Sequence, residues 1–182
     1  MNKSNLLVLS GLSMAAAGAV MIFSENIGIE TSKILIPVLF LAAGITTFLF
    51  AGANGQNSKA SAFHKIQGVL FIIFAGVVAF VPDSLTSFLL YVVYFSLIYG
   101  LIEIVFSFSI LSSKGEIKMS MLIYRFISGF INSIGAMILL LTTLSDEFKG
   151  LQIAGALSIA GGILTILFAN KVKNIVAKSA SI

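Results

Sequence analysis

The stretch Gly44–Ala51 reads GITTFLFA and ends a long apolar run. The same pattern ends two further runs, as GLIEIVFS at Gly100–Ser107 and as GILTILFA at Gly162–Ala169. All three copies have glycine first, threonine or glutamate fourth, phenylalanine seventh and a small residue last. The copies follow one another at similar intervals, and such self-similarity is the sequence signature of a repeated structural unit. The pattern therefore predicts that the chain contains three copies of one unit.

The composition predicts a membrane protein. Of the 182 residues, 58% are hydrophobic and only 10% are charged, whereas a soluble domain needs more charge to cover its surface. Six runs are long enough to cross roughly 30 Å of hydrocarbon as helices, and helices satisfy every backbone polar group within their own segment. We expect these helices near Leu6–Phe23, Ile34–Gly52, Ile66–Val81, Leu85–Leu111, Leu122–Thr143 and Leu151–Ala169. The predicted fold is one all-α membrane domain of six transmembrane helices over residues 1–182.

Each predicted unit is a helical hairpin, in which one helix leads outward and a second helix returns after a short outer turn. The units cover about residues 5–53, 65–112 and 121–170, and a basic tail follows at 171–182. All three hairpins share one orientation. We therefore expect a pseudo-threefold axis along the membrane normal, or a row of hairpins, rather than the inverted repeat of many secondary transporters. The tail either lies on anionic lipid or is unstructured.

Small residues recur along the predicted helices. The outgoing helices open with Ser10-Gly11, Gln67-Gly68 and Ser128-Gly129, and a second small position follows in each at Gly18, Gly76 and Gly135. Small residues allow helix backbones to approach closely in lipid, where packing drives association. We therefore expect helix packing at Gly11, Gly18, Gly44, Gly68, Gly76, Gly100, Gly129 and Gly162. A homo-oligomer interface on the sixth helix is the alternative.

Basic residues gather on one predicted side of the membrane. That side holds Lys3, Lys59, Lys65, Lys114, Lys118, Arg125, Lys171, Lys173 and Lys178, and the other holds Lys33 and Lys149. The positive-inside rule then places both chain ends in the cytoplasm, in a cell (inner) membrane. The pI near 9.4 thus indicates topology, and no nucleic-acid partner is expected. A cleaved signal ending near Ala15–Ala19 is the alternative for the first run, but Gly11 belongs to the repeat, which favours a retained helix.

Glu103 is the only acid inside an apolar run, and it occupies the position of Thr47 and Thr165 in the other copies. An ionisable group within the membrane indicates a functional site by default. Three interpretations remain open: a protonated glutamate that hydrogen-bonds between helices, a proton- or cation-linked role, and a side chain that reaches the inner interface. The expected partner of Glu103 is Asn132, at similar depth in the fifth helix.

Several chemistries are not expected. The chain has no cysteine and one histidine, His64, which is predicted to be solvated in a basic inner connection. Thiolate chemistry and a histidine metal site are therefore excluded. No Ser-His-acid set and no phosphate-binding glycine loop occurs. The sequence thus predicts neither an enzyme nor a cofactor, and its expected partners are the lipid bilayer and a second copy or another membrane protein.

The predicted outer turns are acidic, with Glu25, Glu30, Asp83, Asp146 and Glu147. Exposed Asp and Glu have reference pKa values of about 3.9 and 4.3. We expect this surface to lose its negative charge between about pH 3 and 5. Such a change either alters the binding of a partner or a neighbouring protomer, or is a passive property of an acidic surface.

The middle unit has glycines early in its first helix, at Gly68 and Gly76, a proline at the outer turn, Pro82, and Gly100 followed by Glu103 in the second helix. This unit resembles the short membrane repeat of HdeD-type acid-resistance proteins, and three such repeats would cover the whole chain. The resemblance implies a small multi-pass membrane protein linked to acid stress, with no established reaction. We therefore expect a non-enzymatic membrane protein with a stress-related structural or partner-binding role. The alternative is a small proton-coupled transporter or channel with Glu103 near the path.

Overall fold

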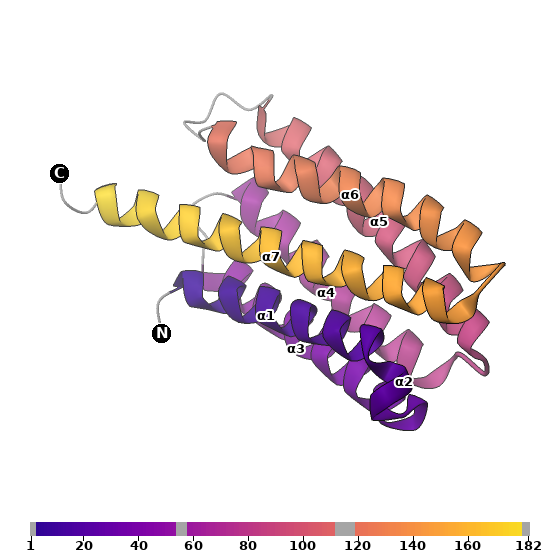
Figure 1. Ribbon diagram of the computed structural model, residues 1–182. Helices are drawn as coiled ribbons and strands as arrows, with labels where there is room; N and C mark the ends of the chain where they lie inside the picture. The colour runs from indigo at the N-terminus through magenta and orange to yellow at the C-terminus, as the bar shows by residue number, and fades with distance from the viewer. Residues whose placement is uncertain (1–2, 54–57, 112–118, 180–182) are drawn as a thin grey trace.

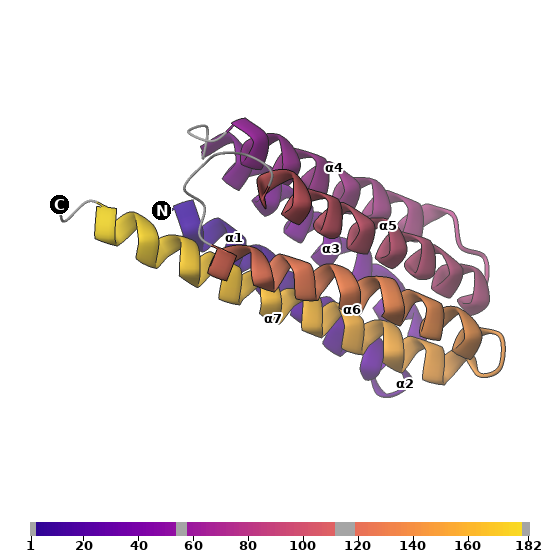
Figure 2. The same ribbon diagram turned by 90° about the horizontal axis from the view of Figure 1, so that it is seen from above.

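The computed structural model describes residues 3–53, 58–111 and 119–179, and these ranges are helical without any strand. The helices are α1 (Lys3–Ile22), α2 (Ser24–Ile27), α3 (Ile29–Ala53), α4 (Ser58–Phe80), α5 (Leu85–Leu111), α6 (Met119–Thr143) and α7 (Glu147–Ser179). Six of them are long and run side by side in both views (Figure 1, Figure 2). The short α2 forms part of the connection between α1 and α3, and Gly28 at its end has a φ of 95°, which favours glycine.

The six long helices form a closed ring in chain order, because each packs against the next and α7 packs back against α1. One end of the ring is where α1 begins and α7 ends, and α3 and α5 end there too (Figure 1). We call this the terminal end. The turn end is the opposite one, where α2 and the turns α4–α5 and α6–α7 lie. The first and the last helix thus begin and end, respectively, at the same end of the bundle.

The six long helices are each long and apolar enough to cross a membrane. They correspond to the six predicted runs, which confirms the all-helical fold with six spans of membrane length. The helices extend furthest beyond the prediction at the start of α4 and the end of α7. Helix α4 begins at Ser58, within the predicted polar connection, and α7 continues through residues 171–179 of the predicted tail. The last turns of α7 project beyond the bundle (Figure 1).

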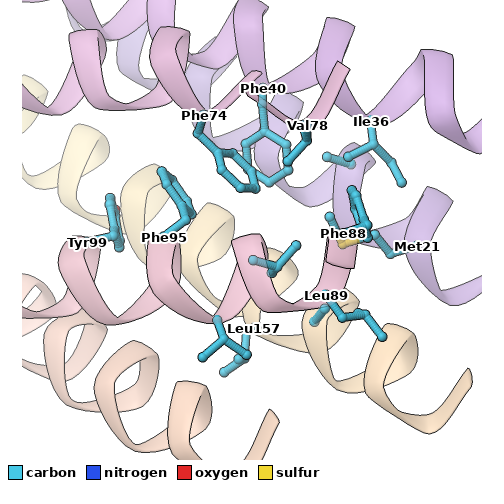
Figure 3. Close-up of a cluster of buried hydrophobic side chains, with 14 of the residues drawn as sticks. Met21, Ile36, Phe40, Phe74, Val78, Phe88, Leu89, Phe95, Tyr99 and Leu157 are labelled. Carbon is cyan, nitrogen blue, oxygen red and sulfur yellow. The ribbon is translucent and has the colours of Figure 1, made fainter. Parts of the chain in front are cut away.

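The outside of the ring is apolar and its inside is aromatic. Outward-facing side chains include Leu141, which is 71% exposed, as expected of a surface that contacts lipid. Inside, the rings of Phe40, Phe74, Phe95 and Tyr99 point into the space between the helices (Figure 3). Phe74 stacks on Phe95 with 4.0 Å between ring centroids. These side chains fill the half of the ring toward the turn end.

The first, fourth, seventh and eighth positions of the three octapeptides face the interior. The fourth position is 2%, 0% and 6% exposed in Thr47, Glu103 and Thr165. The seventh and eighth positions are also buried, namely Phe50, Phe106 and Phe168, and Ala51, Ser107 and Ala169. The second position, which is aliphatic in every copy, is exposed in Ile45, Leu101 and Ile163. The octapeptide pattern therefore indicates which side of each helix faces inward.

Pairs of glycines bring neighbouring helices together at three places. Gly44 on α3 faces Gly68 on α4, Gly100 on α5 faces Gly129 on α6, and Gly162 on α7 faces Gly11 on α1. A Cβ atom added to the glycines at positions 44, 100 and 11 would lie 2.9, 2.7 and 2.6 Å from the partner's carbonyl oxygen. Real Cβ atoms essentially never approach that closely. Only glycine therefore fits these crossings.

The predicted second set of packing glycines is only partly correct. Gly18 packs against Gly155 of α7, and Gly135 packs against the side chain of Leu157. Gly76 is exposed, and an added Cβ would have nothing within 4 Å. The buried small residue of α4 is Ala75, at 3% exposure. It lies seven residues after Gly68, and seven residues complete about two helical turns, which returns to the same face.

Asp146 caps the start of α7. Its Oδ1 accepts a hydrogen bond from the backbone N–H of Lys149 at 3.1 Å, the N-cap contact that Asp and Asn favour. This hydrogen bond, together with the Lys149 ammonium, holds the pKa of Asp146 below its usual value of 3.8. Because the pKa is lower in the folded protein than in the unfolded chain, the charged cap stabilises the helix above pH 3.8. That stabilisation is lost as the pH falls through the folded pKa.

We expect Asp146→Ala to speed amide hydrogen exchange at Lys149 at neutral pH, because the N–H loses its acceptor. Asp146→Asn is the matched control, since asparagine keeps an acceptor oxygen and caps as well as aspartate. It should exchange like the wild type at neutral pH and lack the loss of protection that the wild type shows in acid. Equal exchange in all three proteins at neutral pH would contradict the capping role.

Candidate functional site: a buried charged centre

Glu103 lies in a cluster of polar side chains from three helices, inside the ring. Arg125 of α6 places its Nη1 atom 2.5 Å from Glu103 Oε1. Gln67 of α4 donates a hydrogen bond from Nε2 to the same carboxylate oxygen at 2.6 Å. The side chains of Glu103 and Arg125 are 0% and 3% exposed. We call these three residues, together with His64, the charged centre.

Arg125 is held on two further sides. Its Nη1 also donates to Gln67 Oε1 at 3.4 Å, so the amide of Gln67 bridges both members of the ion pair. The guanidinium carbon lies 4.2 Å from the centroid of the Phe168 ring of α7, where the ring face attracts a cation. The charge of Arg125 is therefore balanced by protein groups rather than by solvent.

His64 is buried in the same cluster and is 2% exposed. Its Nδ1 lies 3.3 Å from Gln67 Oε1, and the rings of Phe50, Phe63 and Phe168 surround it at 5.0, 5.7 and 6.0 Å between centroids. The prediction of a solvated histidine was wrong. Helix α4 begins at Ser58, so His64 is helical and lies three residues from Gln67, on the same inward face.

The sequence had suggested Asn132 as the partner of Glu103, but the amide of Asn132 makes its hydrogen bond elsewhere. Its amide donates to the carbonyl of Ser128 in its own helix at 2.9 Å. The partner is Arg125, which the sequence had assigned to the basic cytoplasmic surface. Two features of the sequence indicated that the Arg125 side chain faces inward. Arg125 lies inside the predicted helix that starts at Leu122. It also lies four residues before Gly129, as His64 lies four residues before Gly68.

The other two candidate polar residues form hydrogen bonds with uncharged groups. Thr47 Oγ1 shares a hydrogen bond with Ser10 Oγ at 2.8 Å, and both residues are buried. Thr165 donates to the carbonyl of Gly161, one turn earlier in its own helix. Ser10 precedes Gly11 as Gln67 precedes Gly68, so the pair Ser10–Thr47 occupies the same pattern positions as Gln67–Glu103.

Some atoms of the charged centre have no hydrogen-bond partner among the described residues. These buried atoms are Glu103 Oε2 and Arg125 Nε and Nη2. Guanidinium cannot release its proton in a protein, so only Glu103 of this ion pair can change its charge. A proton on Glu103 would leave Arg125 as an uncompensated buried cation, which is strongly unfavourable. Protonation of Glu103 therefore requires Arg125 to move or another anion to approach.

Tyr99 separates the charged centre from the aromatic half of the ring. Its hydroxyl lies near Glu103 and Thr165. On the side toward the turn end, a cavity of about 20 Å³ is lined by Tyr99, Ser96 and Asn132 together with apolar residues. A cavity of this size has room for about one water molecule. Phe40 and Phe95 also line this cavity.

Within the part of the chain that the structure describes, no group of three His, Asp or Glu side chains could hold a metal ion. The buried ion pair of Arg125 and Glu103 lies inside the ring. No known protein family, curated protein or solved structure matches this chain. Any functional conclusion therefore comes from the geometry itself.

Proposed function

We propose that the protein spans a membrane as three two-helix units around a pseudo-threefold axis along the membrane normal, with the terminal end in the cytoplasm. The three glycine crossings support this arrangement, because each joins the returning helix of one unit to the outgoing helix of the next. The crossing of Gly162 and Gly11 closes the circle. The equal burial of the three octapeptides is a second support.

In this arrangement, the first unit has uncharged residues at the positions that correspond to the charged centre. Ser10 and Thr47 hydrogen-bond where the middle unit has Gln67 and Glu103. Leu7, four residues before Gly11, is fully buried at the position of His64 and Arg125. The first unit therefore packs at this level without ionisable groups. A buried ion pair is also weak evidence for stability, since apolar residues of similar volume are often as stable.

The function of this protein is accordingly proton-linked transport, without enzymatic activity. The observation that carries the proposal is the fully buried Glu103–Arg125 pair inside a ring of membrane-length helices. Ionisable residues inside membrane bundles mark ion pathways and proton relays. Glu103 is the group that takes up the proton, Arg125 is its counter-charge, Gln67 connects the two, and His64 lies next in line toward the terminal end.

The transport step follows from the charge balance. When Glu103 is protonated, the ion pair with Arg125 is lost. The guanidinium then lowers its free energy by moving toward water at the terminal end, because water solvates its charge. Arg125 lies less than two helical turns from the start of α6, or about 9 Å at 1.5 Å per residue. The aromatic layers on both sides keep the centre closed in the paired state. Proton binding thus favours a different helix arrangement from proton release.

The test is proton flux in proteoliposomes with a trapped pH-sensitive dye and an imposed pH gradient. The wild type should exceed protein-free vesicles. The neutral double variant Glu103→Thr with Arg125→Leu, which copies Thr47 and Leu7, should fall to the vesicle background while still folded. Thr47→Val is the matched control at the uncharged counterpart and should retain flux. Wild-type flux in the double variant would rule out a proton-linked role for the centre.

A second candidate, an acid-stress role through partner binding as the HdeD-like resemblance implies, is favoured by the charges at the turn end. Both lysines at the turn end form an ion pair with an acid three residues earlier in the chain: Lys33 with Glu30 at 2.9 Å and Lys149 with Asp146 at 3.3 Å. The remaining acids leave this surface negative until acid neutralises them. Replacing all five turn-end acids by amides and measuring survival near pH 2.5 tests this role, since unchanged survival and unchanged binding would exclude it.

A further inference from the structure

A cleft of about 390 Å³ opens at the turn end. It lies between the start of α3, the turn from α4 to α5, and the start of α7. Polar residues lie on its rim, among them Glu30, Lys33 and Asp83, whereas Ile36, Val78, Phe88 and Leu151 form its apolar part. The volume falls in the range of small-molecule sites, roughly 300–1,000 Å³. The cleft is separate from the charged centre, which lies toward the terminal end.

The cleft opens where the ring is loosest. Helices α4 and α5 make much less contact than any other neighbouring pair of long helices. Stacked aromatic pairs stand between them, Phe63 on Phe106 at 3.8 Å and Phe74 on Phe95 at 4.0 Å. Among the described residues, no pair of glycines brings α4 and α5 together as glycines do for α3 and α4. The end of α4, the start of α5 and the turn that joins them line the cleft.

The rim of the cleft carries a net negative charge. Lys33 pairs with Glu30 through atoms 2.9 Å apart, so these two charges cancel. Asp83 accepts a hydrogen bond from Ser87 Oγ at 3.1 Å, and it makes no ion pair with any residue that the structure describes. One carboxylate thus stands uncompensated above an apolar floor that includes the aromatic ring of Phe88.

We infer that this cleft binds an amphipathic organic cation. The carboxylate of Asp83 attracts the positive charge, and the apolar floor takes up the hydrocarbon part of the molecule. An aromatic side chain in the lining also favours a cation. An anion of the same shape would be repelled by Asp83, and a lipid chain would bind without regard to that charge. The inference goes beyond the proposed proton-linked function, because it does not require Glu103 to titrate.

The test compares two probes of nearly the same shape and opposite charge, tetraphenylphosphonium and tetraphenylborate. Binding is measured by equilibrium dialysis on the purified protein in a non-ionic detergent at pH 7. Tetraphenylphosphonium should bind saturably and at least about tenfold more tightly than tetraphenylborate. Asp83→Asn, which removes the charge with little change in shape, should weaken tetraphenylphosphonium binding by about five- to tenfold, the size of one partly screened charge interaction.

Two controls locate the site. Glu25 is exposed on α2 and does not line the cleft, so Glu25→Gln should leave binding unchanged. Ala79 lines the cleft, so Ala79→Trp should abolish binding by filling it. Equal binding of both probes, or equal effects of Asp83→Asn and Glu25→Gln, would overturn the inference. The neutral double variant at Glu103 and Arg125 should still bind tetraphenylphosphonium, so failure of the proton-linked function would be seen separately.

Discussion

Arg125→Leu alone should lower the free energy of unfolding by about 3–5 kcal/mol, the usual cost of removing one partner of a buried ion pair. Glu103 would remain inside the ring with only Gln67 as a donor, and Gln67 cannot neutralise a carboxylate. Glu103→Thr alone should be costly for the opposite reason, since Arg125 would keep its charge without a carboxylate beside it, in contact with Phe168 and Gln67. These are the largest losses expected from single substitutions in this protein.

The double variant Glu103→Thr with Arg125→Leu should recover most of that stability. Both replacements already occur at matching positions of the chain, as Thr47 and Leu7, and both are buried there. The measurement is unfolding in detergent for the wild type, both single variants and the double variant, combined as a double-mutant cycle. A coupling of about 2 kcal/mol or more, within the range seen for interacting residues, is expected. Additive losses would show that the ion pair is not the main interaction of either residue.

The fold could be predicted from the sequence because lipid and water impose different requirements. A run of apolar residues of membrane length has few alternatives to a helix, and six runs joined by short connections leave little choice of topology. Helix ends were less predictable. The segment from Ser58 to Lys65 was predicted as a polar connection, yet it forms the first turns of α4. Polar side chains are compatible with a helix end as well as with a solvated connection, so composition alone does not locate the start of the helix.

The candidate site was only half predictable. Glu103 was found because an acid within an apolar run is costly wherever the helix packs. Arg125 and His64 lie near the starts of their helices, where basic residues usually reach the interface. Their inward direction depends on which face of α4 and α6 meets the neighbouring helix. The spacing of four residues before Gly68 and Gly129 carried that information, since positions four apart share a helix face.

The prediction that Gly76 packs against a neighbouring helix was wrong for a similar reason, because the sequence pattern did not show which face of the helix is buried. Gly76 was aligned with Gly18 because both are glycines, although its distance from Gly68 differs by one residue from the distance of Gly18 from Gly11. One residue turns a helix by about 100°. Ala75, at the matching distance, is the residue that packs inside. The face of the helix, rather than the residue type, decides which small residue lies at a crossing.

The second crossing of α1 and α7 offers a sharp test of this view. Gly155→Ala should destabilise the protein by about 1–3 kcal/mol, the usual cost of overpacking a well-packed interior. An added Cβ would lie 2.5 Å from the carbonyl oxygen of Gly18. Backbone atoms cannot rotate away as a side chain can, so α1 and α7 would have to separate. Gly18→Ala should have a similar effect, because its Cβ would meet the carbonyl of Gly155 in the same way.

Gly76→Ala is the matched control, a glycine-to-alanine change near the end of the long helix α4, without a neighbour within 4 Å of the new atom. Alanine has the higher helix propensity by up to about 1 kcal/mol, so this variant should be as stable as the wild type or slightly more stable. Thermal unfolding in one detergent measures all three variants. If Gly76→Ala loses as much stability as Gly155→Ala, the loss reflects glycine's backbone freedom and not the close approach of α1 and α7. If only the variants at Gly18 and Gly155 lose stability, the carbonyl contacts between these two helices are what require glycine.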